Sequence, residues 1–173
     1  ECIRFMGKLR NDIWAAVRLI KLRTYRAKFA YLPPPAIGST ATADAFEEKF
    51  PAIVDDGVPS DWITIEDDFI LFWVSQVTHA STTTFQSPQS KLDDGIFRIF
   101  IIRQPISKLE LLKILLGIET GVHTKYEKPE FIDCVAYRLD PVTTGSFNDV
   151  DGEVVEPGRI QARVIPSALN IFV

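Results

Sequence analysis

Short stretches rich in β-branched and aromatic residues follow one another along most of the chain, with turn-forming residues between them. Such stretches are typical of antiparallel strands, and residues 24–32 alternate Ala27, Phe29 and Tyr31 as a strand with one buried face does. Turns are expected at Asp93-Asp94-Gly95, Asp151-Gly152 and Pro157-Gly158. The expected strands are residues 24–32, 62–65, 69–77, 96–103, 131–139, 153–155, 159–165 and 169–173.

Two segments show helical spacing instead. Residues 1–20 place apolar side chains near a 3.6-residue period, and residues 107–118 begin with a capping box of Ser107 and Glu110 and end before Gly121. The second helix is apolar on more than one side, which predicts that it lies between two layers or that part of it lines an apolar cavity. The expected fold class is mainly β: an antiparallel two-layer β-sandwich with a leading helix and one or two inserted helices.

The composition fits one folded domain, with 46% hydrophobic and 24% charged residues. Residues 33–60 are rich in Pro, Ala, Ser and Thr and predict a flexible loop. The longest apolar run, Phe69–Val74, is far shorter than the ~20 residues that a membrane-spanning helix needs. Cys2 and Cys134 are too few for a disulfide scaffold and fit a reducing compartment. Because the chain starts at Glu1 within an expected helix, we expect it to be part of a longer protein.

The net charge of −4 hides a strong asymmetry, since residues 1–28 carry +6 and the remainder −10. A cationic first segment on an acidic body suggests that this segment faces anions, namely phosphates, acidic lipid headgroups or an acidic partner. A solvated helix face is the alternative interpretation. Nucleic acid is not expected as a partner, because aromatic residues are not interleaved with the basic ones and the rest of the chain would repel a polyanion.

Most motifs of enzyme sites are missing: the chain has no GxxxxGK[ST], GxGxxG, GxSxG, HExxH or CxxC. His79 and His123 lack metal-ligand spacing, so no metal site is predicted and each histidine is interpreted as structural. Cys134 lies in an expected strand and is interpreted as a core residue rather than a nucleophile. Residues 148–153 indicate a type I′ hairpin turn at Asp151-Gly152. In the alternative interpretation, the acidic groups of this turn orient a metal-bound phosphate or a ribose.

Several stretches, taken together and in order, resemble the C-terminal half of sphingosine kinases, within the diacylglycerol-kinase-like lipid kinase superfamily. The matching stretches are Glu1–Gly7 with Arg10, Leu22–Pro33, Asp93–Gly95 with its strand to Arg103, Ile106–His123, Ala136–Pro141 and Val150–Glu153. The resemblance implies that residues 1–173 are the C-terminal lipid-binding β-sandwich domain of an ATP-dependent kinase that converts sphingosine-like bases to the 1-phosphate. In such kinases the glycine-rich GGDG nucleotide loop and the catalytic aspartate lie in an N-terminal domain. Neither is present in this chain, so no catalytic residue is expected here and the chain alone is expected to be inactive.

The resemblance also implies two sets of site residues. The residues that match ATP-binding positions are Arg4, Arg10, Asp151, Gly152 and Glu153. The residues that match lipid-binding positions are Ala15, Val17, Leu19, Leu71, Trp73, Phe100, Ile114, Leu115, Ile118, His123 and Phe131. Nearly all members of the second set are apolar, as an acyl-chain site requires, although ordinary core packing would explain the strand residues nearly as well.

The implied ligands are ATP with Mg²⁺, bound mainly with the N-terminal domain, and a sphingosine-like lipid. The implied location is cytoplasmic, with reversible contact at membrane surfaces. A non-catalytic lipid- or membrane-binding module derived from such a kinase is the alternative from another functional class. Within the kinases, a ceramide or diacylglycerol kinase domain is the alternative.

Overall fold

The computed structural model describes residues 19–35, 50–53, 57–145, 148–166 and 168. The strands are β1 (Tyr25–Leu32), β2 (Ile63–Ser75), β3 (Phe97–Arg103), β4 (Glu130–Cys134), β5 (Ala136–Pro141), β6 (Asn148–Val150), β7 (Glu153–Val155) and β8 (Ile160–Arg163). The helices are α3 (Lys108–Gly117) and the single 3₁₀ turn η2 (Val122–Lys125). None of the helices in these ranges is long and apolar enough to cross a membrane. Of the expected helix over residues 1–20, only 19 and 20 are described, and both are helical; the expected strand over 169–173 lies outside the described residues.

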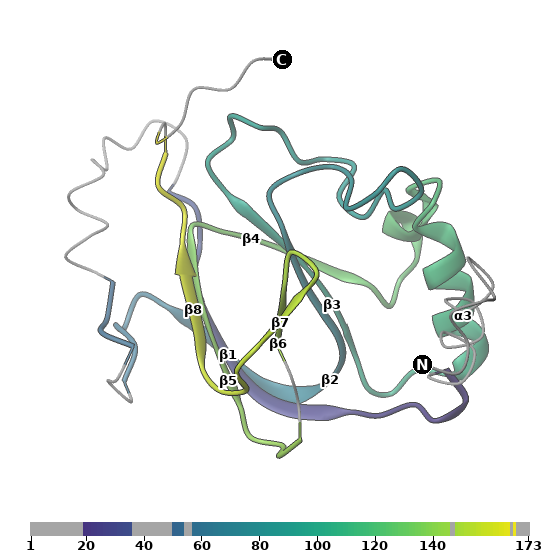
Figure 1. The fold of residues 1–173 in the computed structure, drawn as a ribbon, viewed down its shortest axis with the longest axis horizontal. Coiled ribbons are helices and arrows are strands. Elements are labelled where there is room, and N and C mark those ends of the chain that lie inside the picture. Colours follow the sequence, from purple (N-terminus) through teal and green to yellow (C-terminus); the bar gives the residue numbers. More distant parts are fainter. Residues whose placement is uncertain (1–18, 36–49, 54–56, 146–147, 167, 169–173) are drawn as a thin grey trace.

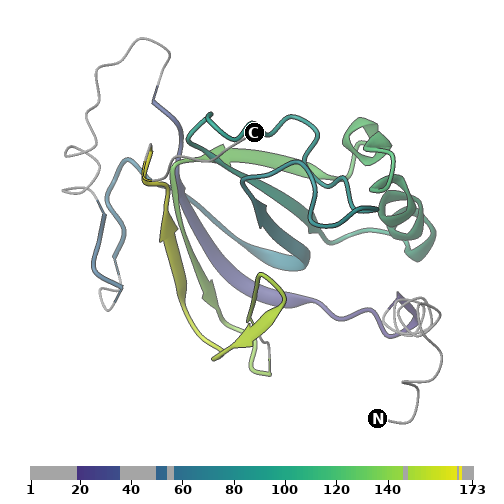
Figure 2. The same cartoon turned by 45° about the horizontal axis from the view of Figure 1, so that its top comes forward.

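Six strands form one antiparallel sheet in the order β4-β3-β2-β1-β5-β8, and β6 and β7 form a separate hairpin. The sheet curves strongly, so that its two halves approach each other around one apolar face (Figures 1 and 2). The rings of Phe97 on β3 and Tyr137 on β5 lie 5.4 Å apart, although β2 and β1 separate these strands in the sheet. Fully buried Phe29, Ile99 and Ile101 lie in the same cluster. The expected mainly β, sandwich-like fold is confirmed.

The expected strands over 62–65 and 69–77 are one continuous strand, so their separation was wrong. The acidic run Glu66-Asp67-Asp68 lies inside this continuous strand, where cross-strand arginines neutralise it. Arg26 Nη2 on β1 lies 3.1 Å from Glu66 Oε1, and Arg103 Nη1 on β3 lies 2.9 Å from Asp67 Oδ2. The N–H of Asp68 and the side chain of Arg103 lower the pKa of Asp67, which keeps its carboxylate charged within the sheet.

The expected single strand over 131–139 divides at Val135 into β4 and β5. β4 is an edge strand beside β3, whereas β5 pairs with β1, so the chain changes sheet position at this residue. Val135 still uses both backbone groups: its N–H donates to the carbonyl of Leu32, and its carbonyl accepts from the N–H of Val164. The break therefore leaves no backbone group of Val135 without a hydrogen bond.

Helix α3 packs against the outer face of β2 and β3, at the right of Figure 1. Its start is the expected capping box, in which the Ser107 hydroxyl accepts from the Glu110 N–H and the Glu110 carboxylate accepts from the Ser107 N–H. Leu111, Ile114 and Ile118 face the sheet. The opposite side of the helix is exposed, so the alternative in which the helix is enclosed between two layers was wrong.

Side chains of β5 and β8 hold the end of the expected loop over residues 33–60. Arg138 is 1% exposed and donates to the carbonyls of Gly57 and Ala52 at 3.0 and 2.9 Å. It also donates to the side chain of Gln161, whose amide in turn donates to the carbonyl of Pro51 at 2.6 Å. A run of loop carbonyls is therefore bound by side chains of the sheet, and we call this arrangement the carbonyl clamp.

Candidate functional site

The main apolar layer outside the sheet interior lies between β2, β3 and α3, and we call it the sheet–helix cluster. Its buried members are Phe100, Ile102, Leu111, Ile114 and Ile118. Its partly buried members are Leu19, Leu22, Ile70, Leu71, Trp73 and Ile106. The cluster thus joins four parts of the chain: residues 19–22, two neighbouring strands and one helix.

Six of the residues predicted to contact lipid lie in this cluster. They are Leu19, Leu71, Trp73, Phe100, Ile114 and Ile118. Leu115 is not a member of the cluster, because it projects from another side of α3 and is 39% exposed. Ala15 and Val17 lie outside the described residues. The structure therefore brings most of the describable set together, in an arrangement that suits either a lipid chain or core packing.

Aromatic rings extend the cluster beyond the end of α3. The Phe100 ring stacks on that of Phe131 at 5.0 Å, and His123 lies 5.3 and 5.8 Å from these two rings. His123 is fully buried, with Nε2 3.0 Å from the carbonyl oxygen of Gln86 and Nδ1 3.4 Å from that of Gly117. The expectation that His123 makes structural hydrogen bonds is confirmed. His123 and Phe131 are also the last two residues predicted to contact lipid, and both adjoin the six that lie in the sheet–helix cluster.

Gly121 positions His123, because it is the N-cap of η2 and turns the chain there with a left-handed backbone at φ 74°. A Cβ on Gly121 would lie 2.9 Å from Phe85 Cδ1 and 3.0 Å from Pro88 Cγ. Gly121→Ala is therefore expected to lower the free energy of unfolding by about 2–3 kcal/mol, from the left-handed backbone and the steric clash together. Chemical denaturation measures this change.

Gly145→Ala is the matched control, because Gly145 has a similar φ of 77° but nothing within 4 Å of its added Cβ. Only the backbone cost of about 1 kcal/mol is expected there. Equal losses in the two variants would mean that the contacts of Gly121 with Phe85 and Pro88 impose no cost.

The predicted nucleotide-binding turn is the tip of the β6–β7 hairpin. Asp151 and Gly152 have φ values of 52° and 90°, which confirms the type I′ turn expected from the sequence. The Gly152 N–H donates to Asp149 Oδ1 at 3.0 Å, and Asp151 and Glu153 are exposed. Both views show the hairpin apart from α3 (Figures 1 and 2). The other two predicted ATP-binding residues, Arg4 and Arg10, lie outside the described residues.

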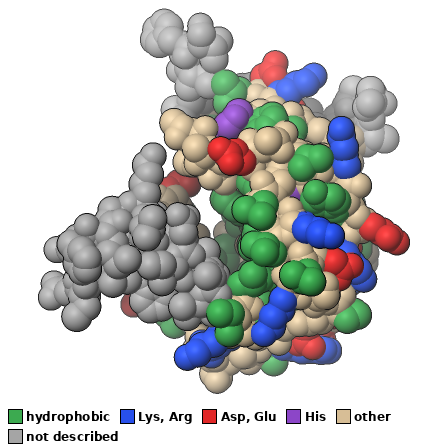
Figure 3. All heavy atoms as spheres, turned by 90° about the vertical axis from the view of Figure 1, so that its right-hand side faces the viewer, with side chains coloured by type: hydrophobic (Ala, Val, Ile, Leu, Met, Phe, Trp, Pro, Cys, Tyr) green, Lys and Arg blue, Asp and Glu red, His purple; other side chains and the backbone are tan. Residues whose placement is uncertain are grey.

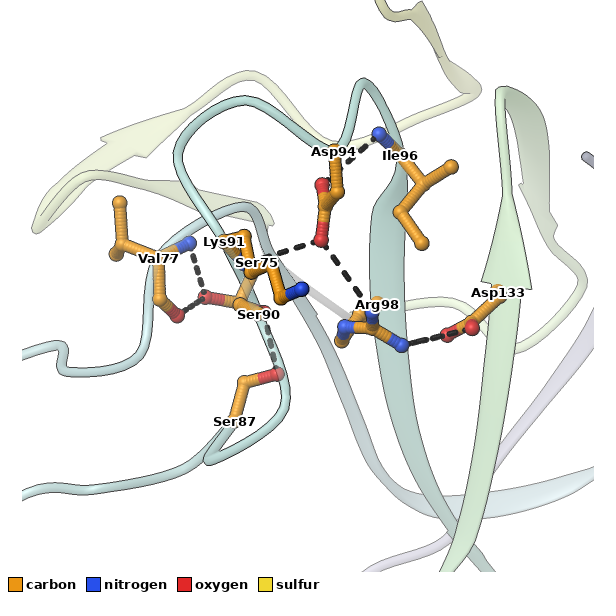
Figure 4. Close-up of polar contacts among 9 residues, drawn as sticks. All are labelled: Ser75, Val77, Ser87, Ser90, Lys91, Asp94, Ile96, Arg98 and Asp133. Carbon is orange, nitrogen blue, oxygen red and sulfur yellow. Dashed lines mark hydrogen bonds and ion pairs between the residues drawn. The ribbon is translucent and has the colours of Figure 1, made fainter.

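The turn at Asp94-Gly95 is held by local hydrogen bonds and one ion-paired arginine (Figure 4). Asp94 accepts from the backbone N–H groups of Lys91 and Ile96, and its Oδ2 lies 3.3 Å from Arg98 Nη2. Arg98 Nη1 also lies 2.7 Å from Asp133 on β4. Arg98 therefore links Asp94, in the turn before β3, to Asp133 on the edge strand β4.

Two further sequence interpretations bear on chemistry. In the described ranges, no group of three or more His, Cys, Asp or Glu side chains could hold a metal ion. Burial raises the pKa of Cys134 to about 12, so its thiol stays protonated near neutral pH. Cys134 is thus a core residue, as expected, and not an activated nucleophile.

Sequence reasoning missed several members of the sheet–helix cluster. Ile102 lies two residues after Phe100 on the same face of β3, so strand alternation was an available signal for it. Strand alternation could not have identified Ile70 as a member, because the register shifts between Phe69 and Leu71. This β-bulge turns Ile70 and Leu71, which are consecutive residues, toward the same face.

Comparison with known proteins identifies a family that matches most of this chain. The family described as "YegS C-terminal NAD kinase beta sandwich-like domain" matches residues 52–173. Sphingosine kinase 1 of Mus musculus is 30% identical over 98% of this chain and 46% of its own length. Sphingosine kinase 1 of Homo sapiens is 31% identical over 96% and 46%, and sphingosine kinase 2 of Arabidopsis thaliana is 25% identical over 94% and 36%. The chain therefore spans less than half the length of these relatives.

Proposed function

The chain belongs to the family of YegS C-terminal NAD kinase beta sandwich-like domains, and from this premise we propose that it is the lipid-binding and nucleotide-completing domain of a sphingosine kinase. The observation that carries the proposal is the gathering of six predicted lipid-contacting residues in the sheet–helix cluster. A sphingosine tail placed between α3 and the sheet would gain about 0.8 kcal/mol for each buried CH₂ group.

The chemistry proposed for the whole protein is transfer of the γ-phosphoryl group of ATP to the primary hydroxyl of sphingosine, which yields sphingosine 1-phosphate and ADP. The nucleotide loop and the catalytic base belong, in this proposal, to a further domain of the same protein. Phosphoryl transfer depends on positioning and on neutralising phosphate charge, so Arg4 and Arg10 are proposed to contact the phosphates.

The β6–β7 turn is proposed to lie against the nucleotide on the other side. Asp151 and Glu153 are exposed, and among the described residues neither side chain has a hydrogen-bond partner. Carboxylate oxygens suit a ribose hydroxyl or Mg²⁺, which proteins usually hold with one or two carboxylates together with substrate phosphates. Two exposed carboxylates on one turn fit a Mg²⁺ ion that is bound with ATP.

A kinase assay on the full-length protein that carries this chain tests the proposal. We expect ATP-dependent phosphorylation of sphingosine that exceeds that of ceramide and diacylglycerol in the same panel. Arg4→Ala or Arg10→Ala is expected to lower kcat/KM on the order of 10–100-fold, because each removes a charge-assisted hydrogen bond to phosphate. Thermal unfolding of the variants should match that of the unmodified protein.

Lys28→Ala is the control for net charge, since Lys28 is an exposed cation of the same basic segment and is not a predicted ATP ligand. Full activity of both arginine variants would remove their phosphate role. Phosphorylation of none of the three lipids would instead favour the non-catalytic lipid-binding module.

A further inference from the structure

The outward side of α3 carries an apolar stripe that no described residue covers. Leu109 is 73% exposed, Leu116 69% and Leu112 38%. At 100° per residue these three leucines fall within an arc of about 60°, on the side of the helix opposite Leu111 and Ile114. The largest apolar patch on a protein surface is often functional, and apolar side chains grouped on one helix face with a polar rim are typical of a binding surface. We call Leu109, Leu112 and Leu116 the leucine stripe.

Lysines flank the leucine stripe on both sides. On the same helical wheel, Lys108 and Lys113 each lie about 40° beyond one edge of it. The acidic residue of α3, Glu110, projects from the far side and is engaged in the capping box with Ser107. Figure 3 shows hydrophobic side chains gathered on the face that α3 presents outward, with basic side chains and some acidic ones next to them.

The segment before β1 continues this surface. Lys108 Nζ donates to the carbonyl of Ile20 at 2.7 Å, which places residues 20–23 beside the start of α3. Ile20 is exposed, and so are the neighbouring cations Lys21 and Arg23. The leucine stripe is therefore bordered by four cations from two segments of the chain, together with one further exposed apolar side chain.

The size and charge of this surface favour a lipid bilayer over a protein as its binding partner. Three leucine side chains present a few hundred Å² at most, well under the ~800 Å² that each partner of a stable protein interface buries. A bilayer needs no such area, because leucines can insert one by one while lysine stems extend along them and keep the ammonium groups at the headgroups. Clustered cations further favour a surface that contains anionic lipids.

We infer that the outward face of α3 docks on an anionic membrane surface, with the leucine stripe inserted and Lys108 and Lys113 at the headgroups. The face lies on the opposite side of α3 from the sheet–helix cluster, so docking leaves that cluster in place. The inference goes beyond the proposed kinase function and does not depend on it, because docking requires neither ATP nor sphingosine.

Vesicle co-sedimentation of the purified protein, without nucleotide or sphingosine, tests this inference. The vesicles contain phosphatidylcholine with phosphatidylserine at about one lipid in five. The double variant Leu109→Ser/Leu116→Ser is expected to bind on the order of 100-fold more weakly, since each leucine contributes about tenfold. Lys108→Gln/Lys113→Gln is expected to weaken binding to these vesicles by about tenfold and to leave binding to pure phosphatidylcholine unchanged.

Val142→Ser/Val154→Ser is the matched control, because these valines are 60% and 69% exposed at places away from α3. This variant should bind vesicles as the unmodified protein does, and thermal unfolding should confirm that all variants are folded. Unchanged binding of the leucine variant, or no vesicle binding by the unmodified protein, would overturn the inference. Self-association that the leucine variant abolishes would also overturn it, by assigning the face to a second copy of the chain.

Discussion

Arg138→Met is expected to lower the free energy of unfolding by about 3–5 kcal/mol, as urea denaturation would measure it. The guanidinium of Arg138 is 1% exposed and donates to two loop carbonyls and to Gln161. Methionine fills a similar volume but donates no hydrogen bond, so all three hydrogen bonds of this buried guanidinium would be lost. The end of the loop would then lose its main attachment to β5.

Arg26→Met is the control for removal of an arginine from a paired site. The side chain of Arg26 is 46% exposed and forms its ion pair with Glu66 at the surface, where such pairs contribute less than about 1 kcal/mol. A loss of less than about 1 kcal/mol in Arg138→Met as well would show that the carbonyl clamp contributes little to stability.

Phe100→Ala is the second substitution for which we expect a large effect, again about 3–5 kcal/mol of unfolding free energy. Phe100 is buried at the centre of the sheet–helix cluster and stacks on Phe131. Truncation at this position leaves a cavity between β3 and α3 in addition to the lost burial of the ring. Calorimetric or chemical unfolding gives the stability change, and the kinase assay gives KM for sphingosine.

Leu115→Ala separates core packing from lipid contact. Leu115 matches a lipid-binding position but is partly exposed, so its truncation should cost less than about 1 kcal/mol of stability. If Leu115 contacts lipid, KM for sphingosine rises in this variant while the unfolding midpoint falls far less than in Phe100→Ala. A Phe100→Ala protein that unfolds at the same midpoint as the unmodified protein would contradict a core role for that ring.

Local features of the fold could be predicted from the sequence. The alternation of Ala27, Phe29 and Tyr31 predicted β1, the Ser107–Glu110 spacing predicted the start of α3, and Asp151-Gly152 predicted the hairpin turn. Each of these signals depends on residues within a few positions of one another. The six lipid-contacting residues that cluster in the structure were predicted from the family resemblance and not from the periodicity of the sequence.

Features that depend on partners distant in sequence could not be predicted in the same way. The acidic run that crosses β2 needs Arg26 and Arg103 from two other strands, and nothing near Glu66 or Asp67 indicates these partners. The bulge before Leu71 and the change of sheet position at Val135 likewise depend on register. Binding of ATP and of sphingosine stays a prediction.

The position of β1 between β2 and β5 determines when this domain can be completed during synthesis on the ribosome. β1 and β2 can pair early, but the other edge of β1 must wait until residues 136–141 have emerged, since Ala27 pairs with Pro141. At about 5–20 residues per second, the intervening hundred or so residues take on the order of ten seconds to synthesise. Until residues 136–141 emerge, the free edge of β1, which carries the apolar side chain of Phe29, is a template on which another chain can pair and aggregate.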